Sequence, residues 1–507
     1  MLYVSPIVEA LRGRPRLVFW TATLVQAVLW TLVPALFYAS PPGDVPLVLA
    51  IGHEWQLGTV YGPPLAYWLA ELAFRLSGNS VVGIYLLAQV CVVVTFWAVF
   101  ALGSSIVGLS HAALAVLLMT GVSVFGAPTP DFGPAVLAMP LTALALLFFW
   151  RAVGEARDRA WLGTGAALGL LLATSYFGAI LFAVLVAFTA AVKRGRMRLL
   201  NPYPYAGLLI ALAIGAPYFV WLARGHLAQI VGIGDWTFAH RATQWASSLA
   251  TLAFDHAGLV LLIIVAGALA ADRKVAVPEI IREPVDPWGK LFVYLFALAP
   301  GLIAITVAAL RGRTEPLGGE GELVVLSGLA VMLLLGDVIP LYRQRAATFT
   351  WLALLLAPPL LAVVSMVVLP WTFAVELKVN DPADAMGRFF TESFNRRTGK
   401  PLAIVVGDER LGALVALGSP QRPSLFIDGS MERSPWLDEA ALRDKGAIVV
   451  WPIVDTAGAP PAALRARFPE LVPEVPRSFE RPVQGRLPLL RIGWAMIRPL
   501  PPSAAPR

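Results

Sequence analysis

Charged residues are scarce in this sequence. Only 14% of its 507 residues are Asp, Glu, Lys or Arg, whereas a soluble domain carries about 25%. Hydrophobic residues make up 58% of the chain. Apolar runs of about 18 to 22 residues recur, which is the length that a helix needs to cross the hydrocarbon of a bilayer. This balance excludes an ordinary soluble protein and predicts a polytopic membrane protein.

The sequence contains a single cysteine, Cys91, which lies inside an apolar run. An intrachain disulfide is therefore excluded, and any domain exposed outside the cytoplasm must fold without one. We interpret Cys91 as a residue of the packed core.

Several signatures of chemistry are also missing. The sequence has no phosphate loop ending in Gly-Lys-Ser/Thr, no His-Glu-x-x-His helix and no Cys/His metal pattern. It also lacks the pair of similar halves that many transporters show. The net charge of +7 does not indicate nucleic-acid binding. The basic residues form short clusters beside apolar runs, which is the orientation signal of a membrane protein.

The apolar runs predict eleven membrane spans. The first run, Leu17 to Tyr38, follows a basic segment at 12–16 and is too long for a secretory signal, and no small-residue cleavage site follows it. We interpret it as an uncleaved span. The expected spans are roughly 17–38, 80–107, 109–126, 133–153, 161–174, 177–192, 204–223, 256–271, 291–310, 323–341 and 348–370.

Lysine and arginine residues predict the orientation. Four basic clusters fall on one side of the predicted membrane: 151–159, 193–198, 273–282 and 343–345. The positive-inside rule assigns that side to the cytoplasm. The segment 39–74 on the other side contains no Lys or Arg, although Arg311 and Arg313 depart from the rule. With the N-terminus inside, residues 371–507 of a bacterial inner-membrane protein would lie in the periplasm.

We expect two domains. Residues 1–370 form the transmembrane domain, with an interfacial outer loop at 39–79, and residues 371–507 form a soluble α/β domain. Short β-rich runs alternate with helix-like stretches in the second domain, which is typical of βαβ units. The β-rich runs are 402–406, 424–427 and 447–451, and the helix-like stretches are 409–417, 437–445 and 461–467. The predicted fold class is mostly α, polytopic, with a C-terminal α/β domain.

The outer loop 39–79 is too polar for a span and too apolar for a free loop. Its apolar residues suit helices that lie along the membrane interface. Asp44 and Glu54 are its first acidic residues, and a carboxylate held at such an interface is able to act as a general base towards a hydroxyl. The alternative is structural. Asp44 before Pro46 is a typical helix start, in which Asp44 serves as a cap.

Two other acidic residues are candidates. Asp131 lies beside a proline in the loop 126–134, which favours a turn, yet this loop falls on the same side as Asp44. Asp337 lies in an apolar run, where a carboxylate is a functional candidate, but its position near the cytoplasmic end also allows it to reach the interface.

The outer segment 224–256 contains basic residues and tryptophans. This composition suits either an anionic lipid head group or an ordinary interfacial belt. Arg311 and Arg313 belong to the same question, because two arginines on the outer side make sense if they bind a phosphate. The candidates in this group are Arg224, His240, Arg241, Arg311 and Arg313.

The first 200 residues resemble GT-C membrane glycosyltransferases, the class that includes protein mannosyltransferases, the aminoarabinose transferase of lipid A and rhizobial galacturonosyl transferases. In that class, an acidic residue follows the first span, and Asp44 matches it. A second acidic position lies about ten residues later, and the segment 52–55 matches it. The Pro-Pro-Leu-x-x-Trp-Leu segment matches 63–69, and an Asp in the second outer loop matches Asp131. Val45 and Gly62 depart from the pattern, in which Glu and Lys are frequent.

The resemblance implies transfer of a sugar from a polyprenyl-phosphate donor to an acceptor on the periplasmic face, with inversion at the anomeric carbon. The acceptor would be lipid A, another lipid, a glycan or a protein. Asp44 would be the general base, with Glu54 and Asp131 as the other catalytic candidates; Asp131 would position the acceptor or hold a divalent metal. The expected substrate-binding residues are His53, Trp55, Tyr61, Pro64, Arg224, His240, Arg241, Arg311 and Arg313.

Two other functions remain open. A transporter or flippase for a lipid-linked glycan predicts functional charges in the middle of the spans, whereas here the ionisable residues gather in the outer loops. A membrane scaffold whose exported domain binds a partner predicts that Asp44→Asn leaves the phenotype intact.

Overall fold

The computed structural model describes residues 6–226, 237–267, 279–312, 316–340, 342–453 and 458–499, without the side chains of residues 225 and 226. The chain forms two compact units. The first, here called the helical unit, comprises Met1–Leu32, Tyr85–Pro130 and Pro134–Leu361. The second, here called the mixed unit, comprises Val33–Ile84, Asp131–Gly133 and Ala362–Arg507. The outer-loop residues therefore belong to the same unit as the C-terminal part of the chain.

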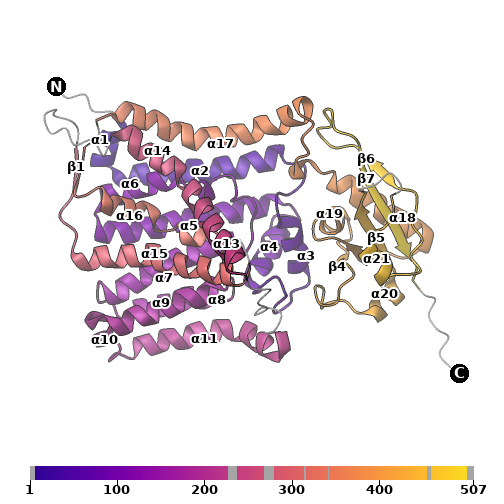
Figure 1. Cartoon of the computed structure of the whole chain (residues 1–507), viewed down its shortest axis with the longest axis horizontal. Helices are drawn as coiled ribbons and strands as arrows, with labels where there is room; N and C mark the ends of the chain where they lie inside the picture. Colours follow the sequence, from indigo (N-terminus) through magenta and orange to yellow (C-terminus); the bar gives the residue numbers. More distant parts are fainter. Residues whose placement is uncertain are drawn as a thin grey trace. The chain divides into compact units, whose positions relative to one another are not determined.

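Long apolar helices dominate the helical unit and run roughly side by side (Figure 1). Those long enough to cross a membrane are α2 (Pro15–Phe37), α5 (Val82–Ile106), α7 (Pro134–Val153), α11 (Tyr203–Trp221), α15 (Pro287–Leu310) and α17 (Gln344–Thr372). The pair α13 (Phe238–Asp255) and α14 (Ala257–Ala266) is bent by 44° and counts as a seventh candidate within the described residues.

Shorter helices complete this unit. They are α1 (Pro6–Gly13), α6 (Leu109–Met119), η1 (Ser123–Phe125), α8 (Ala160–Leu172), α9 (Phe177–Ala191), α10 (Lys193–Arg198), η2 (Leu222–His226), η3 (Gly321–Leu323) and α16 (Ser327–Leu334). Each of the eleven predicted spans overlaps an apolar helix, so the prediction of a polytopic helical protein is confirmed.

Two predicted spans are shorter than expected. The helix predicted at 109–126 ends at Met119, and the one predicted at 323–341 ends at Leu334. After α16 the chain turns through Gly336, whose φ is +90°, and forms β2 (Val338–Pro340). This strand pairs antiparallel with β1 (Glu279–Ile281).

Asp337, which lies in the turn before β2, is therefore not inside a span. It forms an ion pair with the buried Arg282, and the distance between its Oδ1 and the arginine Nε is 3.0 Å. We assign it the structural role of joining the two short strands.

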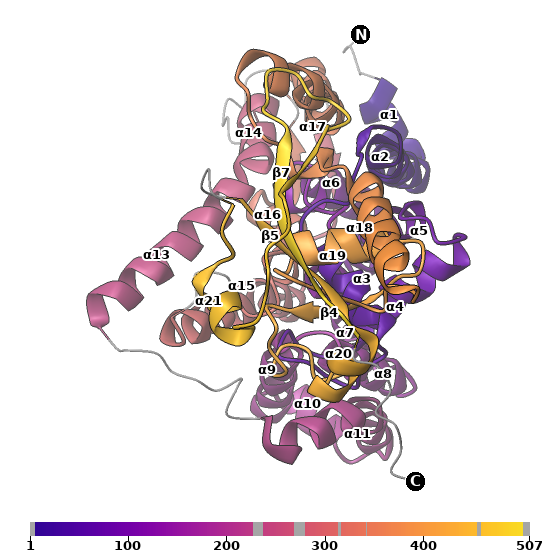
Figure 2. The same cartoon turned by 90° about the vertical axis from the view of Figure 1, so that its right-hand side faces the viewer.

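A five-stranded sheet forms the centre of the mixed unit (Figure 2). Its strand order is β4-β3-β5-β7-β6, with β3, β4 and β5 parallel and β7 antiparallel to its neighbours. The strands are β3 (Ile404–Gly407), β4 (Ser424–Ile427), β5 (Ala447–Pro452), β6 (Arg477–Phe479) and β7 (Leu490–Ile497). The helices after α17 are η4 (Lys378–Asn380), α18 (Ala383–Thr398), α19 (Leu411–Gly418), α20 (Glu439–Lys445) and α21 (Ala462–Arg467). The predicted βαβ alternation is confirmed, whereas α18 and β7 had not been predicted.

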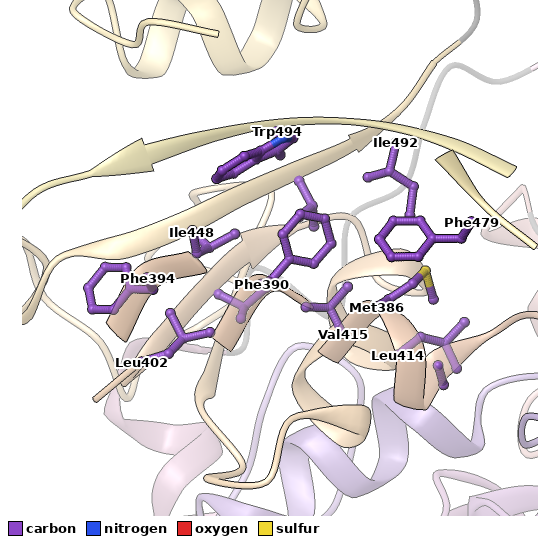
Figure 3. Packing of buried hydrophobic residues seen from close by; sticks show 13 residues of the cluster. Met386, Phe390, Phe394, Leu402, Leu414, Val415, Ile448, Phe479, Ile492 and Trp494 are labelled. Atoms are coloured by element: carbon purple, nitrogen blue, oxygen red, sulfur yellow. The ribbon is translucent and has the colours of Figure 1, made fainter. Parts of the chain in front are cut away.

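The sheet has an apolar cluster on each face, because successive side chains of a strand point to opposite sides. Phe390 of α18 and Val415 of α19 pack with Ile448 and Trp494 on one face (Figure 3). Leu442 of α20 and Leu464 of α21 belong to the cluster that contains Val449 of the same strand, β5. The domain is therefore a three-layer α/β/α sandwich.

The outer loop supplies two helices to the same unit, α3 (Val45–His53) and α4 (Leu65–Leu76). α3 is almost fully buried and packs against α4 and α19, so its apolar residues are covered by protein. The physical reason is its composition, because a helix that is apolar on every side is stable only when it is covered on every side. α4 has an exposed apolar side at Leu72 and Leu76, as expected for an interfacial helix.

Candidate functional site

Asp44 lies immediately before α3, and it is exposed although Val45 to Leu49 and Pro41 are buried. Its carboxylate makes no capping hydrogen bond to α3. Among the described residues, the Asp44 carboxylate has no hydrogen bond or ion pair. The alternative in which the Asp44 side chain caps the helix is therefore wrong, and the side chain is left available at a buried helix start.

Asp131 takes the role of the cap instead. Its Oδ1 accepts a hydrogen bond of 2.8 Å from the backbone N–H of Asp44, and the N–H of Val45 also donates to it. Burial raises the pKa of Asp131 to about 6, and the charge of Asp44 adds to this rise, while the two backbone hydrogen bonds oppose it. The N-terminus of a helix favours a carboxylate electrostatically, so this arrangement is stable although Asp131 comes from a distant loop.

Gly43 allows the two acidic residues to approach each other. Its φ is +47°, and a Cβ atom at this position would lie 1.7 Å from Oδ2 of Asp131. A side chain here would therefore both strain the backbone and displace the Asp131 carboxylate. The glycine is needed for the geometry around Asp44.

Arg410, at the start of α19, holds the same segment from the C-terminal part of the chain. Its Nη1 donates to the carbonyl of Gly43 at 2.6 Å, and its Nη2 donates to the carbonyl of Lys378 at 2.6 Å. Its Nη2 also lies 3.5 Å from a carboxylate oxygen of Asp381. The backbone beside Asp44 is thus fixed on both sides, by Asp131 through its N–H and by Arg410 through the preceding carbonyl.

His53 and Glu54 lie at the opposite end of α3, about 15 Å from Asp44 for an ideal helix of this length. The structure therefore does not bring them to Asp44. His53 contacts the buried Glu71 of α4, with 3.4 Å between Nδ1 and Oε1. Burial raises the pKa of Glu54, although Ser424 and the charge of His53 oppose this rise.

The buried Glu71 is the centre of an ion cluster whose other members are partly exposed. Its carboxylate pairs with Nε of Arg75 at 2.7 Å and with Nη2 of Arg422 at 3.1 Å. Burial alone would raise the pKa of Glu71, but the hydrogen bond from His53 and the charge of Arg422 lower it to about 2. Arg422 also lies over the ring of Phe74, at 4.5 Å from its centroid. This cluster joins α4 to the segment before β4 and is structural.

The other loop candidates have diverse environments. Trp55 is exposed and lies 6.3 Å from Trp68 between ring centroids. Tyr61 donates a hydrogen bond of 2.8 Å to Glu409, and burial raises the pKa of its hydroxyl. Pro64 is buried at the start of α4. Of these three side chains, only that of Trp55 is exposed.

The basic candidates belong to the helical unit. His240 and Arg241 of α13 both approach Gln244, whose Nε2 donates to the carbonyl of Gly312 at 3.0 Å. Because Arg311 directly precedes Gly312, the structure brings Arg311 to the same end of α15 as this group. Arg224 is exposed in η2, and Arg313 lies outside the described residues. Three of the five predicted cations are thus neighbours.

Three residues of the mixed unit were not predicted from the sequence: Arg410, Glu71 and Arg422. Glu71 carried a signal, because it is a lone acidic residue in an apolar helix with Arg75 one turn later. The sequence around the two arginines contains no such signal, since they contact segments more than 300 residues away. Within the described residues, no group of three or more His, Cys, Asp or Glu side chains is placed to hold a metal ion.

The helices and the α/β domain define a multi-pass membrane protein with the fold of the GT-C glycosyltransferases, so the resemblance is confirmed. The profile of the dolichyl-phosphate-mannose-protein mannosyltransferases matches residues 61–221, just under a third of the chain. No curated protein matches the sequence.

Two solved structures of ArnT from Cupriavidus metallidurans are similar over nearly the whole chain. The structure bound to undecaprenyl phosphate matches with a TM-score of 0.59 and 13% identity, and covers 97% of this chain and 99% of that chain. The apo structure matches with a TM-score of 0.50 and 14% identity, and covers 96% and 98%. At this identity the likeness establishes the fold.

Proposed function

We propose that this protein is a glycosyltransferase that moves a sugar from a polyprenyl-phosphate carrier to an acceptor hydroxyl at the periplasmic face of a bacterial inner membrane. The fold and the family profile support a glycosyltransferase. The similarity to a structure that contains undecaprenyl phosphate supports a carrier of this type, and the match to that structure has a higher TM-score than the match to its apo form.

The observation that carries the proposal is the state of Asp44. Its backbone is held by Asp131 and, through Gly43, by Arg410, while its carboxylate is exposed and makes no hydrogen bond or ion pair with the described residues. A general base needs this combination, because it must be fixed in position and yet keep its lone pairs for the substrate.

The proposed chemistry is an inverting transfer. Asp44 accepts the proton of the acceptor hydroxyl while the hydroxyl oxygen attacks the anomeric carbon from the side opposite to the phosphate. The bond between the anomeric carbon and the phosphate oxygen breaks, and the electron pair leaves with the polyprenyl phosphate. The attack inverts the anomeric carbon. Asp131, whose oxygens accept from backbone N–H groups, positions the segment and is not itself the base.

The leaving phosphate gains negative charge, which cations stabilise. His240, Arg241 and Arg311 are the candidates that the structure groups together, and Arg224 and Arg313 remain candidates from the sequence. The distribution of basic loops supports a cytoplasmic N-terminus and a periplasmic mixed unit. We propose that the C-terminal domain at 371–507 recognises the acceptor or covers the site.

The experiment compares envelope lipids and glycans from a deletion strain complemented with wild type, Asp44→Asn or Asp384→Asn. Asp384 is the matched control, because it is another exposed aspartate of the same unit and lies in α18. Mass spectrometry measures sugar-modified acceptors and polyprenyl-phosphate sugars. We expect wild type and Asp384→Asn to restore one missing sugar. Asp44→Asn should lower the transfer rate about 10²- to 10⁴-fold, the usual contribution of a general base.

Accumulation of the polyprenyl-phosphate sugar in the Asp44→Asn strain would identify both the donor and the blocked step. Full restoration by a normally folded Asp44→Asn protein would remove Asp44 as the base. A deletion strain with no change in any glycan would leave the scaffold function as the better account.

A further inference from the structure

A cavity of about 240 Å³ opens among α8, α9 and α11 of the helical unit. Leu168 of α8, Phe182 and Val186 of α9, and Leu208 and Ala211 of α11 are among the residues that line it. The cavity exists because α8 packs tightly on α11, where a Cβ atom on Gly165 would lie 2.0 Å from the Gly207 carbonyl oxygen. α9 does not take part in this close contact between α8 and α11.

The lining offers hydrocarbon and almost no hydrogen-bonding groups. Its two threonine hydroxyls are already used, because Thr164 donates to the carbonyl of Ala160 at 3.1 Å and Thr189 donates to the carbonyl of Leu185 at 2.7 Å. Val186 is 51% exposed, so the cavity is open towards the surroundings of the bundle. A polar ligand would lose its water here without compensation, whereas an acyl chain would fit.

One end of the cavity has a different character. The Trp161 ring lines this end, and its indole N–H is buried without a hydrogen-bond acceptor among the described residues. Trp150 of α7 and Trp288 of α15 also have indole N–H groups without an acceptor in the described part of the chain. Tryptophans of this kind gather where the hydrocarbon of a bilayer meets the ester and head-group region.

A basic segment borders the same end. Ala190, at the end of α9, and Leu199, directly after α10, both line the cavity. α10 is folded against the end of α9 by Arg196, whose Nη1 donates to the carbonyls of Ala190 and Ala191 at 3.0 Å each. Lys193 of α10 is exposed. The segments 151–159 and 193–198 together contain seven basic and two acidic residues, a net charge of +5.

We propose that this cavity is a binding site for an anionic glycerophospholipid. One acyl chain occupies the slot between α9 and α11, an ester carbonyl accepts the hydrogen bond of Trp161, and the charged head group lies against α10. The three features select different parts of such a lipid. The cavity selects hydrocarbon, the indole selects an oxygen at the depth of the ester, and the basic segments select negative charge. This site is independent of the proposed glycosyl transfer.

The test uses the full chain, purified in mild detergent and examined by native mass spectrometry. Phosphatidylglycerol and phosphatidylcholine with identical acyl chains are titrated onto delipidated protein. Val186→Trp fills the slot, and Leu209→Trp is its control, because Leu209 is 67% exposed on α11 but does not line the cavity. Lys193→Gln removes a charge from α10, and Arg491→Gln, exposed in the mixed unit, removes one elsewhere.

We expect wild type to bind one phosphatidylglycerol at least tenfold more tightly than phosphatidylcholine. Val186→Trp should abolish this binding, Lys193→Gln should weaken it several-fold, and the two controls should match wild type. Equal affinity for the two lipids would overturn the proposal, as would unchanged binding to a folded Val186→Trp protein. Binding of polyprenyl phosphate in place of phosphatidylglycerol, abolished by Val186→Trp and retained by Leu209→Trp, would also overturn the assigned occupant.

Discussion

The Oδ1 atom of Asp131 accepts a 2.8 Å hydrogen bond from the backbone N–H of Asp44, so one acidic residue fixes the position of another. The two residues are 87 positions apart in the sequence and meet at the start of α3. The carboxylate of Asp131 is satisfied by backbone N–H groups, while that of Asp44 is exposed. The two residues therefore have different proposed roles. Asp131 is a positioning residue, and Asp44 is the candidate base.

Substitution of Asp131 should separate these roles. Asp131→Ala removes the acceptor at the start of α3 and should cost about 1 kcal/mol of stability, as the loss of a helix cap does, and should reduce kcat. Asp131→Asn keeps one oxygen as an acceptor and should retain most of the activity. Thermal unfolding and turnover of both variants provide the measurement. An Asp131→Asn protein as inactive as Asp44→Asn would show instead that the charge of Asp131 takes part in the chemistry.

Gly43→Ala should disrupt the same geometry from the backbone. The added Cβ would meet the Asp131 carboxylate, and the residue would have to keep a φ of +47°. We expect a loss of stability of about 1–3 kcal/mol and a larger loss of activity. Gly13→Ala is the control, since a Cβ at Gly13 meets no atom within 4 Å. Equal activity of the two variants would show that the contact between Gly43 and Asp131 is not required.

Arg410 should act through the position of Gly43. Arg410→Lys keeps the charge but cannot donate at once to the carbonyls of Gly43 and Lys378, because a lysine ammonium lacks the planar fork of the guanidinium. We expect Arg410→Lys and Arg410→Ala to lower kcat to a similar degree with little change in donor KM. Steady-state kinetics measure this split. Full activity of Arg410→Lys would indicate that only the positive charge matters.

Acid should weaken the ion cluster around Glu71. The pKa of Glu71 is about 2 in the folded protein against an ordinary value of 4.5, so its contribution is fully present above pH 4.5. That contribution is lost as the pH falls towards 2, and its size is about 3 kcal/mol. Thermal unfolding between pH 7 and pH 3 should show more than half of this loss.

Two variants test the assignment of this acid effect. Glu71→Gln should abolish this part of the pH dependence, and it should destabilise the protein at pH 7 by about 1–3 kcal/mol, because the partly buried Arg422 would lose its charged partner. Glu480→Gln removes an exposed carboxylate and should behave as wild type. The same acid dependence in Glu71→Gln and wild type would assign the effect to other groups.

The sequence by itself determined the polytopic helical character, the α/β alternation of the C-terminal part and the two acidic candidates, Asp44 and Asp131. Each of these depends on local properties. A span is a matter of length and hydropathy, a βαβ unit alternates within about 40 residues, and Asp44 stands at a recognisable helix start. The ends of α6 and α16 were missed because turns, rather than hydropathy, terminate those helices.

Only the tertiary structure decided which residues surround Asp44. Asp131 accepts a hydrogen bond from the backbone at the start of α3. Arg410, rather than the expected His53 and Glu54, contacts the segment beside Asp44. α3 packs against α19. Arg410 contacts a residue 367 positions away, and no local pattern encodes a contact across such a distance. The physical reason is that the partner of a buried polar group is chosen by packing in three dimensions, whereas hydropathy and periodicity record only which segments are buried and which elements they form.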